Sequence, residues 1–490
     1  MSIQTDQIVE LTPRSVPAVS YHDSAESEGT SGQASVNAPS HVQQLPPVDG
    51  GFHAWAFLGA AFFIEALVWG FPDAFGVFLD AYLADPIYTS QHNASSLIPL
   101  IGPISSGIIY CVAPFITPLI NRYPSYRRPA MYIGLLVCWA SLFGASYTTK
   151  VTTLVALQGV LYALGSALLY FPSLSYLAEW FINLRGFANG VLFAGTGVGG
   201  IVLPLTISRL LSAYGVNVTV RILSVAMVVL LLPLLPLVKG RLPVGYNAVN
   251  AEMRPVPRGS AASARSWMRS IHFWVLMAAN TIHGFAYFVP LLWLPTFASS
   301  LNLSTTKSSA TITVFHTGSF LGRLLMGYLS DRTANCLLLG LGSLLATSVT
   351  TFVLWGVCST NLAGLLAFSM MFGFFAGNWP SLWSGFGKVL TISDPTLSMT
   401  LFGMLLFSRG LGNIASTPIS SALTGISSSS PSQAISGSKS VHFGSGFDVA
   451  GGRFSTTIVY VGTCFAGAGI ILMCGWVVDL YRLSRSHNLS

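Results

Sequence analysis

Long apolar runs separated by short polar segments dominate the chain from residue 54 onward. A helix that crosses a bilayer needs roughly 20 predominantly apolar residues, and about twelve runs approach or exceed that length. They lie near 54–79, 96–119, 129–148, 152–176, 187–208, 219–238, 271–297, 309–329, 335–356, 361–386, 397–423 and 455–479. The pattern predicts an all-α polytopic membrane protein with twelve transmembrane helices.

The polar segments divide the chain into five parts. Residues 1–48 are rich in Ser, Pro and Gln, a composition that cannot bury a core, so we expect a disordered cytoplasmic tail. A polar, basic stretch at 239–270 separates six runs in 49–238 from six in 271–482. This layout favours two six-helix bundles joined by a cytoplasmic linker, followed by a second cytoplasmic tail at 483–490.

Composition narrows the class of protein. Of the 490 residues, 52% are hydrophobic and 8% are charged, whereas a soluble domain carries about 25% charged residues. The bilayer must therefore be the solvent for much of the chain. The net charge of +7 raises the question of nucleic acid, but the basic residues form no patch with interleaved aromatic residues. We therefore expect no nucleic-acid partner.

Lysines and arginines are unevenly divided between the two ends of the predicted helices. The loops on the side of the 239–270 stretch, including Arg127 and Arg128, hold most of them. Cytoplasmic loops carry such an excess, so both termini are expected in the cytoplasm. Because no retention signal is evident, we expect the plasma membrane as the host membrane.

Three glycosylation sequons fall in loops that this topology places outside. They begin at Asn93, Asn217 and Asn302, and an Asn-x-Ser/Thr sequon accepts a glycan when it is exposed outside the cytoplasm. Asn93 is the strongest candidate, because Asn217 lies close to the membrane.

Ionisable residues inside membrane helices are costly and are functional candidates by default. Glu65, Asp73, His316, Arg323 and Arg409 are the candidates for substrate binding. Glu65 and Asp73 lie about 80° apart around one helix and about 12 Å apart along it, so both are expected to face one cavity. The alternative for each acid is snorkelling to an interface or a structural pair with an arginine.

Arg323 stays charged and needs a partner. The sequence leaves three open: a carboxylate substrate, Asp73, or backbone carbonyls. His316 lies on nearly the same helix face as Arg323, and Arg409 is followed by Gly410. Elsewhere, small residues recur at i+4, as in Gly186 and Gly190, a spacing that lets membrane helices approach closely.

Four segments carry motifs in a fixed order. Asp49-Gly50-Gly51-Phe52-His53-Ala54-Trp55 precedes the first run, and Trp69-Gly70-Phe71-Pro72-Asp73 lies near its end. Trp180-Phe181-Ile182-Asn183-Leu184-Arg185-Gly186 joins the fourth run to the fifth, and Gly327-Tyr328-Leu329-Ser330-Asp331-Arg332 follows the eighth. These segments resemble the major facilitator superfamily and, within it, the fungal type of the monocarboxylate-transporter-like branch.

The resemblance implies alternating access. The expected function is secondary active or facilitative transport of a small organic molecule, either monocarboxylate-like or a secondary metabolite. Asp331, Arg332 and Arg185 match positions of the conformational switch, with Asp331 and Arg332 acting as a charge latch. Arg323 matches the arginine that binds the substrate anion in carboxylate-transporting members.

Two positions depart from the proton-coupled members of the branch. Ser319 stands where they have an acidic residue, and Asp73 stands where they have a lysine. Proton coupling of the lactate type is therefore in doubt, although Asp73 is able to take over proton binding because burial and a nearby arginine both act on its carboxyl group.

The remaining function classes are less favoured. A transporter-like nutrient sensor or receptor stays open, but residues 1–48 and 239–270 give little room for a signalling domain. No nucleotide-binding P-loop, metal-ligand cluster or nucleophile motif occurs, so we expect no enzyme activity and no cofactor. The expected partners are a small organic substrate, a proton and the lipid bilayer, and we expect a monomer.

Overall fold

The structure is a computed structural model that describes residues 45–243, 266–333, 335–391, 397–424 and 444–487. These residues belong to one compact unit that begins at Leu45, and in its described part the unit is helical with no strand. Most of the predicted tail at 1–48 and of the predicted linker at 239–270 lies outside the described residues.

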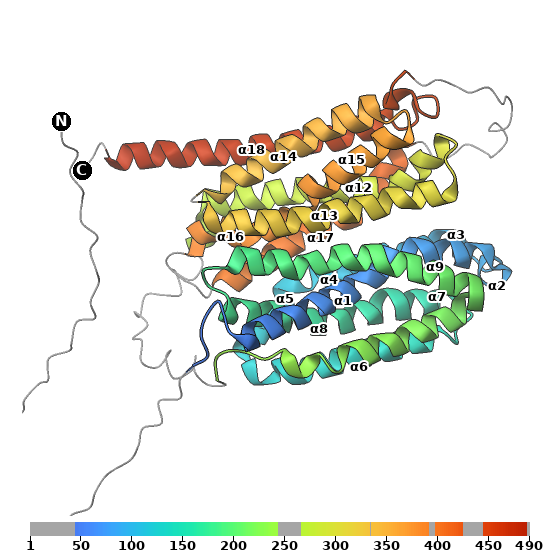
Figure 1. The fold of residues 1–490 in the computed structure, drawn as a ribbon, viewed down its shortest axis with the longest axis horizontal. Helices are drawn as coiled ribbons and strands as arrows, with labels where there is room; N and C mark the ends of the chain where they lie inside the picture. Colours follow the sequence, from blue (N-terminus) through green and yellow to red (C-terminus); the bar gives the residue numbers. More distant parts are fainter. Residues whose placement is uncertain (1–44, 244–265, 334, 392–396, 425–443, 488–490) are drawn as a thin grey trace, which may run out of the picture. The chain divides into compact units, whose positions relative to one another are not determined.

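The first half of the chain supplies the helices that Figure 1 draws from blue to green. A π-helical stretch, Val155–Leu161, joins α7 to α8. The α-helices are α1 (Phe52–Ala84), α2 (Pro86–Thr89), α3 (Ala94–Leu97), α4 (Ile101–Cys111), α5 (Ala113–Arg122), α6 (Arg127–Ala145), α7 (Val151–Leu154), α8 (Tyr162–Trp180) and α9 (Arg185–Leu231).

The second half supplies the helices drawn from yellow to red, which lie together beside the first group (Figure 1). Its α-helices are α12 (Ile271–Ser300), α13 (Thr305–Arg332), α14 (Cys336–Thr350), α15 (Leu362–Gly377), α16 (Trp379–Thr391), α17 (Leu397–Leu423) and α18 (Ser455–His487). Helix α18 continues past residue 479, where the sequence predicted the end of the last apolar run, and past residue 482, the predicted end of the second bundle. A helix satisfies its backbone hydrogen bonds internally in water as well as in lipid.

The described residues account for the predicted number of membrane passes. Nine helical segments are long and apolar enough to cross a membrane. One of them, Arg185–Leu237, has 53 residues and contains Gly215 at φ 74°, a left-handed conformation that ends one pass and begins the next. Helices α13 and α17, which are more polar, complete the twelve passes.

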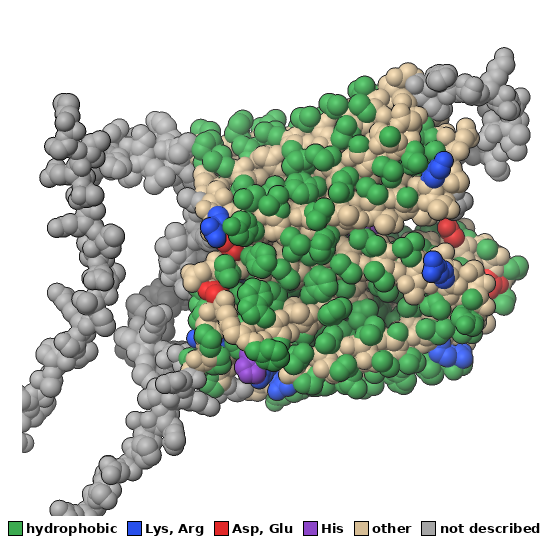
Figure 2. Space-filling view, viewed as in Figure 1, with side chains coloured by type: hydrophobic (Ala, Val, Ile, Leu, Met, Phe, Trp, Pro, Cys, Tyr) green, Lys and Arg blue, Asp and Glu red, His purple; other side chains and the backbone are tan. Residues whose placement is uncertain are grey.

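The helices share two ends, which differ in what they carry. We call the end where α1 and α12 begin the linker side, because both ends of the undescribed segment 244–265 emerge there. The opposite end, with α2 and α3, is called the far side (Figure 1). Figure 2 shows hydrophobic side chains along the helices and most charged side chains at these two ends, the distribution expected of a protein that spans a bilayer.

Helix α9 packs closely on two neighbours through its small residues. A Cβ atom at Gly195 or Gly199 would lie 2.3 Å from the Phe62 carbonyl oxygen or 2.4 Å from that of Ala66 in α1. On another face of α9, Gly190 approaches Gly327 of α13, so that an added Cβ would lie 3.3 Å from its Cα atom. The predicted close helix packing is confirmed. Helix α9 belongs to the first bundle and packs against α13 of the second bundle.

Candidate functional site

A proline in α1 prepares the position of Asp73. Pro72 has no N–H group, so the carbonyl of Val68, one turn earlier, lacks its usual partner within the helix. The hydroxyl of Tyr162 in α8 donates to that carbonyl at 3.1 Å and to the Leu67 carbonyl at 3.2 Å. Helix α8 thus fixes α1 at the turn from which the half-buried Asp73 projects.

A helix break separates α15 from α16 at Asn378. Pro380 removes the N–H that would bond the Ala376 carbonyl, and Ser381 bonds the Asn378 carbonyl instead of that of Gly377. The freed carbonyl of Ala376 lies 3.2 Å from His283 Nε2, and that of Gly377 accepts from Arg323 Nε at 2.9 Å. Broken membrane helices present backbone groups in this way.

This break was not predicted from the sequence, although the sequence contains its signal. Pro380 interrupts an apolar helix directly after Asn378-Trp379, and a proline within a helix frees the carbonyl one turn earlier. The two freed carbonyls hold the side chains of His283 and Arg323 in position. The break therefore organises the site.

Arg323 connects the two bundles through backbone carbonyls. Besides Gly377 in its own bundle, it donates through Nη1 to the carbonyl of Phe193 in α9, and its side chain is 5% exposed. Of the three partners that the sequence left open, the structure shows backbone carbonyls as the hydrogen-bond partners. Glu65 and Asp73 interact with Arg323 only electrostatically.

Arg409 lies in a different environment. Its Nη1 atom is 3.1 Å from His283 Nδ1, and its guanidinium carbon lies over the ring of Tyr287 at 4.3 Å and over that of Phe288 at 5.4 Å. The side chain is 1% exposed, and its Nε has no hydrogen-bond partner among the described residues. Asp73 of the other bundle interacts with it electrostatically.

Glu65 and His316 occupy separate positions. Glu65 faces α9, where Thr196 donates to Oε1 at 2.8 Å, while Oε2 has no hydrogen-bond partner among the described residues. His316 of α13 packs against Gly200 of α9, where an added Cβ would lie 2.4 Å from the imidazole ring. Glu65 therefore lies within the first bundle. Asp73 of the first bundle and Arg409 of the second interact with each other and lie between the bundles.

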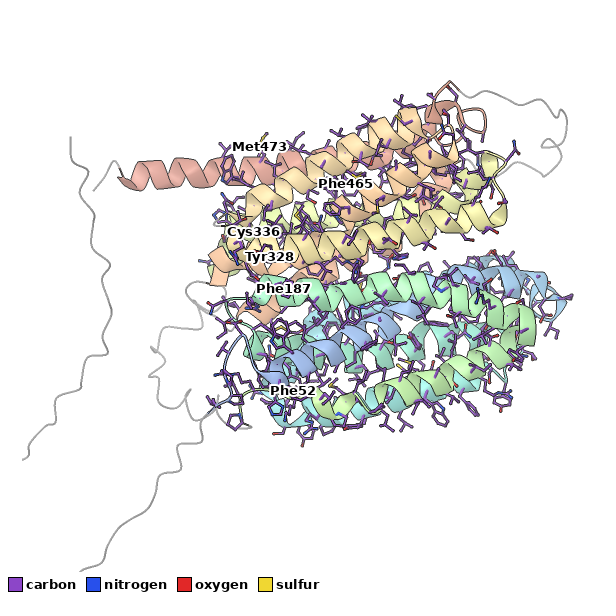
Figure 3. The ribbon with its side chains drawn as sticks, in the orientation of Figure 1. Phe52, Phe187, Tyr328, Cys336, Phe465 and Met473 are labelled. Atoms are coloured by element: carbon purple, nitrogen blue, oxygen red, sulfur yellow. The ribbon has the colours of Figure 1, made fainter. Side chains whose placement is uncertain are left out.

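On the linker side, a carboxylate of the second bundle binds the start of a helix in the first bundle. Asp331 accepts from the backbone nitrogens of Gly186 and Phe187, each at 2.7 Å, at the start of α9. A carboxylate is stabilised at a helix N-terminus by free N–H groups and the helix dipole. We call this contact the linker-side latch, and Figure 3 shows Phe187 and Tyr328 on the facing edges of the two bundles there.

The other two predicted switch residues, Arg332 and Arg185, make contacts of different kinds. Arg332 is exposed and lies over the ring of Tyr328 at 5.1 Å, so Asp331 is the member of the predicted latch pair that contacts a helix end. Arg185 donates to the Ser398 hydroxyl of the other bundle at 2.7 Å. Asp331 and Arg185 thus connect the bundles, and Arg332 does not.

Asp49 holds the same stretch of chain from within the first bundle. Its carboxylate accepts from the backbone nitrogens of Ile182 at 2.8 Å, Asn183 at 3.0 Å and Leu184 at 3.1 Å. Partial burial acts to raise the pKa of the Asp49 carboxyl, but these hydrogen bonds outweigh it and hold the pKa below its ordinary value. The motif that precedes the first helix therefore positions the segment before α9.

The three sequons lie on the far side with different surroundings. Asn93 and Asn302 are exposed and adopt φ 60° and φ 58° in turns. Asn217 instead accepts from the Tyr88 hydroxyl at 3.3 Å, and Thr219 of its sequon is fully buried. The geometry therefore favours Asn93 and Asn302 as acceptors and disfavours Asn217. Among the described residues, no group of three or more His, Cys, Asp and Glu is arranged to hold a metal ion.

Comparison with known proteins gives relatives along most of the chain. The MFS-type transporter hasB of Aspergillus fumigatus is 28% identical over 409 residues, which cover 79% of this chain and 85% of that protein. The aspyridones efflux protein apdF of Emericella nidulans is 26% identical over 358 residues, which cover 71% of this chain and 68% of that protein.

The fold is also similar to that of a solved structure. The proton:xylose symporter XylE, bound to 6-bromo-6-deoxy-D-glucose, superposes with a TM-score of 0.62 at 14% sequence identity, over 86% of this chain and 95% of that chain. At this identity the likeness concerns the fold, which is that of two six-helix bundles.

The family model of the Major Facilitator Superfamily matches residues 58–417. The relatives are transporters, and none of these findings supports the alternative of a nutrient sensor or receptor. The chain is therefore a multi-pass membrane transporter with the twelve-helix fold predicted from its apolar runs, and it belongs to the Major Facilitator Superfamily.

Proposed function

We propose that this transporter exports a small organic molecule, a secondary metabolite, across the plasma membrane by alternating access. The observation that carries alternating access is the distribution of contacts between the bundles. Among the described residues, hydrogen bonds between them run from the linker side to the middle, from Arg185–Ser398 to Ser106–Asn413. Beyond that level none is present, so the structure corresponds to a state closed on the linker side.

The export direction and the metabolite class rest on the relatives. The protein of Emericella nidulans is named as an efflux protein for aspyridones. The motif from Asp49 to Trp55 further supports the fungal monocarboxylate-transporter-like branch as the subfamily.

The linker side is proposed to face the cytoplasm. It carries Arg122, Arg127 and Arg128 on the first bundle, in agreement with the rule that cytoplasmic loops are rich in basic residues. Asn93 and Asn302 are on the far side, where glycosylation would occur. Both termini are then cytoplasmic, with bundles at 49–238 and 271–482 and a cytoplasmic linker at 239–270.

Substrate is proposed to bind between the bundles, near Asp73 and Arg409. Arg323 and His316 lie at the contact between α9 and α13 and contribute to closing the linker side. Glu65 is proposed as a proton site, because one oxygen of its carboxyl group is held by Thr196 and the other has no hydrogen-bond partner among the described residues. Replacement of Glu65 by Gln should then uncouple transport from the proton gradient while substrate binding remains.

Disruption of the gene in its own host tests the export proposal. Metabolites inside the cells and in the medium are compared between the disrupted strain, the parent strain and a strain with the gene restored. A compound that accumulates inside and disappears from the medium supports export and identifies the substrate. A compound that stays unconsumed in the medium indicates import and overturns the proposal, as does an unchanged distribution of every metabolite.

A further inference from the structure

Arg409 is a buried cation with no acidic residue within ion-pair distance in the described part of the chain. Among the described residues the ion pair within 4.0 Å is that of Arg127 with Glu179, at 2.6 Å. A charge buried without a close counter-charge is costly. A protein that keeps one in its interior therefore gains something from the uncompensated charge, and in a transporter the natural counter-charge is the substrate.

His283 fixes the position of Arg409 without neutralising it. The Ala376 carbonyl only accepts hydrogen bonds and a guanidinium only donates them. His283 Nε2 must therefore donate to Ala376, and Nδ1 must accept from Arg409. Both bonds require a neutral imidazole with its proton on Nε2, so the positive charge of Arg409 remains available.

Aromatic rings from both bundles surround this charge. Tyr287 and Phe288 of α12 lie against the guanidinium. The ring of Phe288 is 6.4 Å from that of Tyr110 in α4, and the ring of Tyr110 is 4.5 Å from that of Trp69 in α1. Rings at these distances offer apolar faces on which a planar group stacks.

Three residues near the charge keep part of their surface accessible. Asp73, Tyr110 and Phe288 are each partly exposed, although all three are near the buried Arg409. In the described part of the chain, no hydrogen bond joins the two bundles between this level and the far side. We call Asp73, Tyr110, His283, Phe288 and Arg409 the central layer.

We infer that the central layer binds an organic anion with a planar unsaturated body, whose charged group bonds to Arg409 and whose body stacks on Tyr110 and Phe288. This inference rests on the proposed function and names its substrate class. It assigns the anion to Arg409 and not to Arg323, because the hydrogen bonds of Arg323 go to backbone carbonyls in both bundles. Asp73 competes with the substrate anion for the same positive charge.

Matched probes test the inference with purified full-length protein. Binding of 2-naphthoate, its neutral amide 2-naphthamide, and cyclohexanecarboxylate is measured by isothermal titration calorimetry. The wild-type protein should bind 2-naphthoate about tenfold to a hundredfold more tightly than the amide, since a hydrogen bond to a charged group is worth that factor. Cyclohexanecarboxylate, which lacks a planar body, should bind more weakly than 2-naphthoate.

The variants separate the two arginines. Arg409→Gln should abolish the preference for acid over amide, whereas Arg323→Gln should keep it. Asp73→Asn should tighten binding of the acid and leave the amide unchanged. Arg221→Gln is a matched control, because Arg221 also lies over a tyrosine ring, at 4.3 Å from that of Tyr147, but outside the central layer.

Each result decides between the alternatives. Equal binding of acid and amide to the wild-type protein, or no binding of 2-naphthoate, overturns the inference, as does loss of the preference in Arg323→Gln alone. If Arg409→Gln does not fold, the increase expected for Asp73→Asn still tests the charge. If the wild-type protein does not prefer 2-naphthoate over 2-naphthamide but the disrupted strain retains a metabolite, export stands and the inference on the central layer fails. If the protein prefers 2-naphthoate but the disrupted strain retains no metabolite, export fails and the inference on the central layer stands.

Discussion

The contact between the bundles consists of two regions that use charged residues differently. On the linker side, both oxygens of Asp331 accept backbone N–H groups, and Arg323 donates to two backbone carbonyls. In the central layer, the contacts of Arg409 among the described residues are with neutral His283, the Tyr110 hydroxyl and the surrounding aromatic rings. A charge satisfied by backbone groups holds helices together, whereas a charge without such partners is free to meet a ligand.

Removing the charge of the linker-side latch should give the largest effect. Asp331→Asn leaves one acceptor for two N–H groups, and bonds to charged groups are worth roughly 1.5–3 kcal/mol. We expect the linker side to open about tenfold more often. Phe402 of α17 is buried and stacks on Phe193 of α9, with their ring centroids 6.0 Å apart. Phe402→Cys, in a background whose six free cysteines are replaced by Ser, therefore reports opening by its rate of maleimide labelling.

Arg332→Gln is the matched control for the latch, because Arg332 is the adjacent charged residue and does not cross between the bundles. Its labelling rate should stay close to that of the unaltered protein. Equal acceleration by both substitutions would contradict the assignment of the latch to Asp331 alone and would support a latch that needs both charged residues.

A methyl group between α9 and α13 should test the same region by packing alone. In Gly190→Ala the added carbon would lie 2.5 Å from the Arg323 carbonyl oxygen, and overpacking costs about 1–3 kcal/mol. Gly59→Ala in α1 meets nothing within 4 Å and should stabilise its helix by about 0.5–1 kcal/mol. Thermal unfolding in detergent measures both, and shifts of the same sign would refute the contact.

Restoring one helical hydrogen bond should weaken the central layer and leave the linker side unchanged. Pro380→Ala supplies an N–H that competes with His283 for the Ala376 carbonyl. We expect binding of 2-naphthoate to weaken about twofold to tenfold, the value of one hydrogen bond. Pro418→Ala, at an exposed position of α17, should not change binding, and a change in maleimide labelling by Pro380→Ala would show that the two regions are not separate.

The smallest effect is expected at Asp49, which lies outside both regions. Its pKa in the folded protein is below its ordinary value, so its stabilising contribution is present above the unfolded pKa of about 3.9 and is lost as the pH falls through the folded pKa. The contribution is about 0.5–1 kcal/mol because solvent screens the group. Asp49→Asn should lower the unfolding temperature slightly at pH 7, and its difference from the wild-type protein should shrink below about pH 4. A difference that is constant with pH would contradict this origin.

The sequence identified much of the fold because membrane helices are visible as apolar runs. The apolar runs predicted twelve membrane passes, and the polar stretch between the sixth and seventh runs predicted the division into two bundles. The small residues of α9 predicted its close packing against neighbouring helices. Glu65, Asp73, Arg323 and Arg409 were likewise recognisable, since any charge in an apolar run stands out. These features depend on local composition and spacing, which the bilayer makes decisive.

Only the tertiary structure decided what each charged residue contacts. Asp331 and Arg332 were predicted to act together as a charge latch, and the structure shows that Asp331 binds the start of α9 while Arg332 lies over Tyr328. Arg323 and Arg409 are alike in sequence terms, but carbonyls freed near Asn378 and Pro380 bind one directly and the other through His283. Hydrogen bonds between residues far apart in the chain depend on how helices pack, and no spacing within one helix determines that.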